Sequence, residues 1–135
     1  MFQRELTISP NGRGLYEITE KIQSIVSSSD IEEGLCNVFI KHTSASLLIQ
    51  ENASKEVLTD ILNFFEKIVP EHSEYLHSIE GPDDMPSHLR SILSETSLMI
   101  PVKGNRLDLG VWQGIFLFEH RRSSFNRKIY LSVFD

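Results

Sequence analysis

Three histidines are the residues of this chain best suited to metal chemistry. The segment HSIEGPDDMPSH, residues 77–88, begins and ends with a histidine and carries two adjacent aspartates between them. His42 ends the stretch EGLCNVFIKH, where a predicted strand meets a loop, and functional residues often collect at such places. Because neutral imidazoles bind zinc and similar ions, His42, His77 and His88 are candidate ligands of one divalent metal ion, zinc or magnesium.

The spacing of these histidines forms no metal motif by itself, because neither HExxH nor CxxC occurs in the chain. The gaps of 35 and 11 residues work only if the fold brings the rings together. The alternative is that they are structural histidines with hydrogen-bond partners inside the protein. His120 is a weaker candidate than the other three, and His72 lies in a stretch typical of a solvated loop.

The adjacent acids Asp83 and Asp84 form a second candidate group. Paired carboxylates can hold magnesium when substrate phosphates complete its coordination, and either one could take a catalytic role. The alternative is that one carboxylate caps the helix that begins near Pro86 and the other is solvated.

The stretch HTSAS, residues 42–46, is a candidate phosphate-binding segment. The hydroxyl groups of Thr43 and Ser44 could bind a phosphate together with loop amides, although turn-forming serine and threonine explain the pattern equally well. A serine–histidine nucleophile pair is disfavoured, because neighbouring residues of a strand point to opposite faces. The chain contains no Walker loop, GxSxG motif or dinucleotide fingerprint.

The basic cluster RRSSFNRK, residues 121–128, lies in a predicted hairpin loop. It is typical of a solvated turn, but one guanidinium, from Arg121, Arg122 or Arg127, could bind a phosphate. Trp112 and Gln113 lie near the start of a predicted strand, where they could either pack or line a substrate platform.

The elements that must position these residues follow from apolar periodicity. Strands are expected at 4–9, 33–42, 46–51, 97–102, 110–120 and 127–134, and the second and third of these could pair as a hairpin. Helices are expected after Thr19, at 53–69 and at 84–95. This order favours a single α+β domain over residues 1–135, with a mixed, largely antiparallel sheet packed with three helices.

Both later helices show apolar stripes that we expect to be buried. The stripe of the 84–95 helix places His88 at the edge of its buried face. The stripe residues are Val57, Leu58, Ile61, Leu62, Phe65 and Ile68 in the first helix, and Met85, Leu89, Ile92 and Leu93 in the second.

Composition narrows the class of protein. The chain has 135 residues, of which 40% are hydrophobic and 24% charged, and its net charge of −6 argues against nucleic-acid or anionic-membrane partners. A single cysteine, Cys36, allows no intramolecular disulfide. The N-terminus lacks the pattern of a signal peptide, and no apolar run approaches the roughly 20 residues of a membrane span. We therefore expect a cytoplasmic protein.

Four segments together resemble the YjbQ family, in which some members are described as secondary thiamine-phosphate synthases. They are HTSASLLIQEN, EGPDDMPSHLRSIL, IPVKGNRLDLGVWQGIFLFEHR and RKIYLSVF, and they cover nearly the whole chain in order. One departure is Val111, where the family usually has threonine before WQGI.

The resemblance implies an α+β fold assembled as a homotrimer, with sites between subunits. It implies that His42, His77 and His88 come together, with Asp83 and Asp84 nearby. Five more residues would complete the surroundings: Glu51 as a candidate acid or base, Asn52 beside it, and Gln113 with Trp112 and Arg127 as lining or phosphate-binding residues.

The implied reaction joins hydroxymethylpyrimidine diphosphate to thiazole phosphate and releases pyrophosphate. Such a step needs stabilisation of charge on the leaving diphosphate, which a divalent ion and an arginine can supply. Two alternatives stay open. One is a metal-dependent hydrolase of a small phosphorylated substrate, and the other is a trimeric metal- or metabolite-binding protein without turnover.

Overall fold

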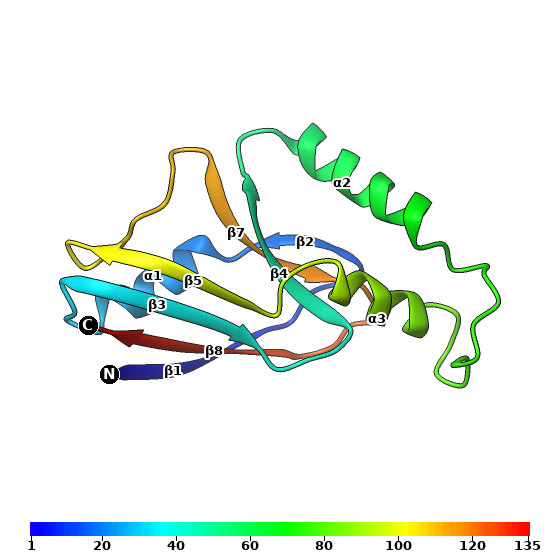
Figure 1. The fold of residues 1–135 in the computed structure, drawn as a ribbon, viewed down its shortest axis with the longest axis horizontal. Helices are drawn as coiled ribbons and strands as arrows, with labels where there is room; N and C mark the ends of the chain where they lie inside the picture. The colour runs from blue at the N-terminus through cyan, green and yellow to red at the C-terminus, as the bar shows by residue number, and fades with distance from the viewer.

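Two antiparallel sheets form the body of the protein, which a computed structural model describes over residues 1–135 (Figure 1). The larger sheet has the strand order β1-β8-β3-β5-β6, and the smaller has the order β2-β7-β4. The strands are β1 Phe2–Ile8, β2 Gly14–Glu17, β3 Glu33–Ile40, β4 Ala45–Glu51, β5 Ser97–Lys103, β6 Arg106–Leu107, β7 Gln113–Glu119 and β8 Arg127–Phe134. With three helices, α1 Thr19–Ser27, α2 Lys55–Ile68 and α3 Asp84–Ile92, the α+β prediction is confirmed.

One hydrophobic core joins the two sheets. In β3 the residues Cys36, Val38 and Ile40 are buried, whereas Leu35 and Phe39 on the other face are partly exposed, so the expected alternation is confirmed. The same core includes Leu47 from β4, residues of β5, β7 and β8, and Ile22 from α1. None of the helices is long and apolar enough to cross a membrane.

The predicted hairpin between residues 33–42 and 46–51 is wrong. Strand β3 lies between β8 and β5 in the larger sheet, whereas β4 pairs with β7 in the smaller sheet. The chain crosses from one sheet to the other at His42–Ser44, and both strands thereby turn their apolar side chains toward the same core.

The stretch between residues 14 and 19 also differs from expectation. Residues Gly14–Glu17 form the short strand β2 against β7, which was not predicted, and helix α1 begins at Thr19, close to the predicted start. The Thr19 hydroxyl makes no cap; it accepts a hydrogen bond from the Ile115 amide (2.9 Å) and donates one to the Glu17 carboxylate (2.8 Å). Thr19 therefore ties the helix to the sheet.

Helix α2 begins after Ser54 and ends before Pro70, as the sequence predicts, but its apolar stripe is only partly covered. Only Phe65 within the helix is buried, and its ring meets that of Phe118 edge-on, with centroids 5.0 Å apart. Phe64 and Ile68 are each about half exposed. Figure 1 shows α2 at the periphery of the molecule, outside the two sheets.

Helix α3 buries the opposite face from the one predicted. Ile92 and Leu93 are 75% and 57% exposed, whereas Asp84, Pro86, Ser87 and Arg90 are buried. The expected stripe of Met85, Leu89, Ile92 and Leu93 is therefore wrong. On the inward face, Asp84 pairs with Arg121, His77 and His88, and Arg90 donates to the Val69 carbonyl.

Candidate metal-binding site

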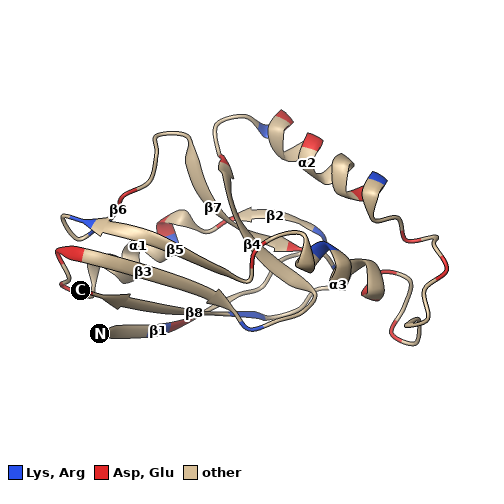
Figure 2. Cartoon of the chain, viewed as in Figure 1, with Lys and Arg blue, Asp and Glu red and all other residues tan.

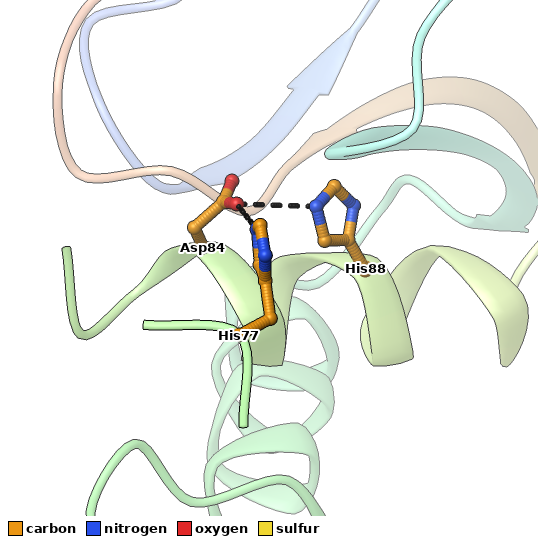
Figure 3. A group of neighbouring side chains, drawn as sticks. All are labelled: His77, Asp84 and His88. Atoms are coloured by element: carbon orange, nitrogen blue, oxygen red, sulfur yellow. Dashed lines mark hydrogen bonds and ion pairs between the residues drawn. The ribbon is translucent and has the colours of Figure 1, made fainter. Parts of the chain in front are cut away.

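His77, Asp84 and His88 form one compact group, called the histidine–aspartate group below (Figure 3). Their nearest ligand atoms all lie within 4.8 Å of one another. Asp84 Oδ2 lies 2.7 Å from His77 Nε2 and 3.2 Å from His88 Nε2. The carboxylate is buried, while the His77 ring is half exposed and the His88 ring less so. The group therefore has a buried carboxylate at its bottom, and its two imidazole rings are partly open to solvent.

Local sequence explains how the three residues meet. Asp84 and His88 are four residues apart on α3, so they share one face of the helix. His77 comes from the loop before the helix, which turns back at Gly81. Gly81 has φ +102°, a conformation that side-chain-bearing residues rarely adopt, so glycine suits this turn.

Arg121 holds both aspartates in place. Its Nε donates to Asp83 Oδ2 (3.0 Å), its Nη1 to Asp84 Oδ1 (2.8 Å) and its Nη2 to the Glu80 carbonyl (3.0 Å). Asp83 also accepts a bond from the Arg122 amide (2.9 Å) and makes no helix cap. Asp83 therefore supports the loops, and of the two carboxylates only Asp84 belongs to the histidine–aspartate group.

Both aspartates are ionised at neutral pH. Burial alone would raise the pKa of Asp84, but the hydrogen bond from His77 and the charges of His88 and Arg121 bring it below its usual value. Burial likewise opposes ionisation of Asp83, and the hydrogen bonds from the Arg122 amide and Arg121 lower its pKa. A full negative charge thus lies between the two imidazoles.

The tautomer of His88 is fixed by the backbone. His88 Nδ1 lies 2.9 Å from the Thr43 carbonyl oxygen, which can only accept, so Nδ1 carries a proton. In the neutral ring, Nε2 then directs a lone pair toward the Asp84 carboxylate. Two electron-rich atoms at 3.2 Å repel unless a proton or a metal ion lies between them.

His42 lies beside the group without joining it. Its Nε2 accepts a hydrogen bond from the Lys128 amide (2.8 Å), and its Nδ1 lies 3.4 Å from Arg127 Nη1. Burial, and then the charge of Arg127, lowers the pKa of His42. His42 and His88 line the same pocket of about 390 Å³. The three-histidine metal site stays a prediction. In this structure the third residue grouped with His77 and His88 is Asp84.

Arg127, predicted to bind phosphate, forms a buried ion pair. Its Nε and Nη2 donate to the two carboxylate oxygens of Glu119, at 2.7 and 2.6 Å, and Nη2 also donates to Ser44 Oγ (3.0 Å). Both charged side chains are almost fully buried. The guanidinium is already paired, so Arg127 and Ser44 join β7, β8 and the 42–44 connection. Thr43 lines the His42–His88 pocket.

The remaining predicted residues lie at the other end of the small sheet. The β4–β7 register pairs Ala45 with Glu119 at one end and Glu51 with Gln113 at the other, about 20 Å away at the usual rise per residue. Asn52 Nδ2 donates to Glu17 (3.2 Å), and Gln113 Oε1 accepts from the Gly110 amide (2.8 Å). Within one chain, Glu51, Asn52 and Gln113 do not meet the histidine–aspartate group.

Arg121 is the supporting residue that sequence reasoning placed in a solvated turn. It is largely buried and contacts both aspartates. The sequence signal that could have identified Arg121 is the acidic pair, because two adjacent buried carboxylates need a cation. RRSSFNRK is the only basic cluster in the chain that could supply it.

Comparison with known proteins gives one consistent family. The family described as "UPF0047 protein YjbQ-like" matches residues 4–135. A UPF0047 protein of Synechocystis is 50% identical over 97% of this chain and 90% of its own length. The UPF0047 protein YjbQ of Salmonella typhimurium is 44% identical over 98% and 96% of the two chains.

Solved structures share the fold. A protein of Clostridium acetobutylicum, described as an uncharacterized conserved protein of the YjbQ/UPF0047 family, superposes with a TM-score of 0.86 at 30% identity, covering 99% of this chain and 100% of its own. A hypothetical protein from Aeropyrum pernix gives a TM-score of 0.90 at 26% identity, covering 99% and 98%.

Proposed function

Because the chain belongs to the UPF0047, YjbQ-like family, we propose that it is a metal-dependent enzyme acting on a small phosphorylated metabolite. The histidine–aspartate group would hold the ion. The proposed reaction is the transfer catalysed by thiamine-phosphate synthases, in which hydroxymethylpyrimidine diphosphate and thiazole phosphate are joined and pyrophosphate leaves.

The observation that carries this proposal is the facing pair His88 Nε2 and Asp84 Oδ2. The Thr43 carbonyl fixes a proton on the far nitrogen, so in the neutral ring the near nitrogen would offer its lone pair to a metal ion beside Asp84. Backbone or carboxylate partners that orient a histidine in this way are typical of metal sites. Arg121 plays the equivalent part for Asp84 by holding its second oxygen.

The donor set favours zinc over magnesium. Two imidazole nitrogens and one carboxylate oxygen match catalytic zinc sites, which use three protein ligands and leave a position for water or substrate. Magnesium prefers an octahedron of oxygen atoms. The partly exposed rings of His77 and His88 leave that side of the group accessible.

When bound, the ion would act as a Lewis acid on a phosphate oxygen of the leaving diphosphate. The chain's own residues would position it: Asp84 supplies the buried charge, and His77 and His88 supply the open rim. Thr43 and His42 line the adjoining pocket, where a substrate could lie next to the ligands.

A homotrimer with sites between subunits is the second part of the proposal. The groove between β4 and α2 has a volume of about 430 Å³ and is lined mostly by apolar residues, including Leu48, Ile61, Phe64 and Phe65. Unpaired apolar surface of this kind is typical of an interface between chains. A neighbouring chain could also bring Glu51 close to the histidine–aspartate group, which one chain cannot do.

Activity of the purified protein tests the reaction. We expect thiamine phosphate to form from the two substrates, to stop after chelation of divalent ions and to resume when zinc is restored. His88→Ala is expected to abolish it, whereas His72→Ala, an exposed loop histidine outside the group, should not.

Other outcomes would favour the other functions. Hydrolysis of simple phosphoesters without a need for the pyrimidine would indicate a hydrolase. Tight zinc binding with no turnover on either substrate set would indicate a binding protein. An unchanged rate in a His77, Asp84 and His88 triple alanine variant would contradict the site.

A further inference from the structure

Arg90 is a buried cation without an acidic partner. It is only 2% exposed, it donates through Nη2 to the Val69 carbonyl (3.0 Å), and its Nε has no partner in the protein. The other deeply buried arginine, Arg127, is matched by both oxygens of Glu119. Since a buried charge is costly unless it is paired, Arg90 stands out as the unpaired case.

Arg90 lines a pocket of about 240 Å³ on the side of α3 that faces the end of α2. The lining includes Arg13, Arg90, Arg122, Glu66, Glu71 and His72. Arg90 is the only Lys or Arg of α3, where it forms the single blue segment of that helix in Figure 2. Three arginines thus meet two glutamates, on a molecule whose net charge is −6.

The one buried acid of this pocket is already shared. Glu71 accepts from Arg13 Nη2 through one carboxylate oxygen and from Arg122 Nη2 through the other. Glu66 is exposed on α2 and makes no ion pair with Arg90. Arg90 therefore has no carboxylate partner within the chain. The pocket beside it has room for an anion from solution.

We propose that this pocket, called the Arg90 pocket, binds a small oxyanion, such as the phosphate or carboxylate group of a metabolite. A planar guanidinium offers several N–H donors in a fixed arrangement that suits the oxygens of such a group. Arg90 would supply the buried charge, and Arg122, which is partly exposed, would close over the anion from the rim.

The Arg90 pocket is distinct from the proposed metal site, although the two are neighbours. Glu71 also lines the adjacent pocket that contains His77, so an anion at Arg90 would lie one pocket away from the histidine–aspartate group. The proposal does not require a metal ion. Anion binding in the Arg90 pocket can therefore be tested independently of the metal-dependent function.

The test is a calorimetric titration of the chelator-treated full chain with inorganic phosphate, and in a second arm with acetate. We expect saturable phosphate binding at one site per chain, weakened at least about tenfold by Arg90→Met, the loss of a charged hydrogen-bond partner. Arg122→Ala should weaken it several-fold without disturbing the core, since that side chain is 63% exposed. Arginine-dependent acetate binding would extend the ligand class to carboxylates.

Two control variants make the test decisive. Arg106→Ala, on the exposed strand β6, and His88→Ala, in the histidine–aspartate group, should both bind phosphate as the wild type does. No saturable phosphate binding by the wild type would overturn the proposal. So would a phosphate affinity of Arg90→Met equal to that of the wild type, since an Arg90 that only ties α3 to the Val69 carbonyl predicts that result.

Discussion

At the scale of single residues, buried polar groups are arranged so that protons have defined positions. Ser94 Oγ donates to the Arg90 carbonyl (2.8 Å), so in its contact with Ser46 Oγ (2.6 Å) it accepts. Ser46 thus accepts from His120 Nε2 (2.8 Å), which makes Nε2 the protonated nitrogen of that ring. This chain of bonds joins the end of β7 to α3, the helix that carries the proposed metal ligands.

His120 should make stability depend on pH. Burial, and then the charges of Arg90, Arg13 and Arg127, lowers its pKa from 6.5 to about 3. Between these values the unfolded chain binds a proton that the folded chain does not. The contribution of His120 to the free energy of unfolding is therefore constant above pH 6.5. It falls as the pH drops below 6.5, by up to about 1.4 kcal/mol per pH unit.

The measurement is the free energy of urea unfolding at pH 7, 6 and 5, for the wild type and for His120→Phe. The lowered pKa of His42 adds a dependence of the same sign, so the difference between the two proteins is what counts. We expect a shallower slope in the variant. Parallel slopes would mean that His120 is not a buried neutral ring.

The buried pair Glu119–Arg127 gives a second residue-scale prediction. Removing one partner by Arg127→Met or Glu119→Gln should cost about 3–5 kcal/mol in unfolding free energy, because an unpaired charge or donor is left in the core. The double variant Glu119→Gln/Arg127→Met should lose less than the two single losses combined. Additive losses in chemical denaturation would show that the pair is not coupled.

At the scale of elements, alternating strands were predictable and the buried face of α3 was not. Period-two burial identified residues 33–42 as a strand, because Cys36, Val38 and Ile40 fill the core whatever their partner strand is. The sequence could not show that β3 and β4 belong to different sheets. That choice depends on β7 and β8, which lie about 65 to 100 residues further along the chain.

Helix α3 shows why the candidate site was only partly predictable. Apolar spacing pointed to Ile92 and Leu93, but the buried face carries Asp84 and Arg90. A polar face is buried only when its partners are in place, and Arg121 lies more than 30 residues away in sequence. Arg127 pairs with Glu119, a residue only 8 positions away in sequence, so its guanidinium is not free for the predicted phosphate role.

At the scale of the whole molecule, the partly exposed apolar groove between β4 and α2 predicts assembly. We expect the wild type to behave as a trimer in light scattering, and Ile61→Asp/Phe64→Asp to give monomers that keep the circular dichroism of the fold. Met99→Asp, at an exposed position on the outer face of the larger sheet, is the matched control and should stay trimeric. A wild type that is already monomeric would contradict the interface and the shared site.

The central claim is that His77, Asp84 and His88 bind one divalent ion, and zinc titration tests it most directly. Calorimetry on the chelated protein should give one zinc per chain, with affinity reduced at least about tenfold by His77→Ala, Asp84→Asn and His88→Ala. His42→Ala separates the two ligand sets: near wild-type affinity supports the histidine–aspartate group, and a loss as large as that of His88→Ala supports the three-histidine set. Zinc affinity unchanged in Asp84→Asn and His88→Ala would contradict the claim.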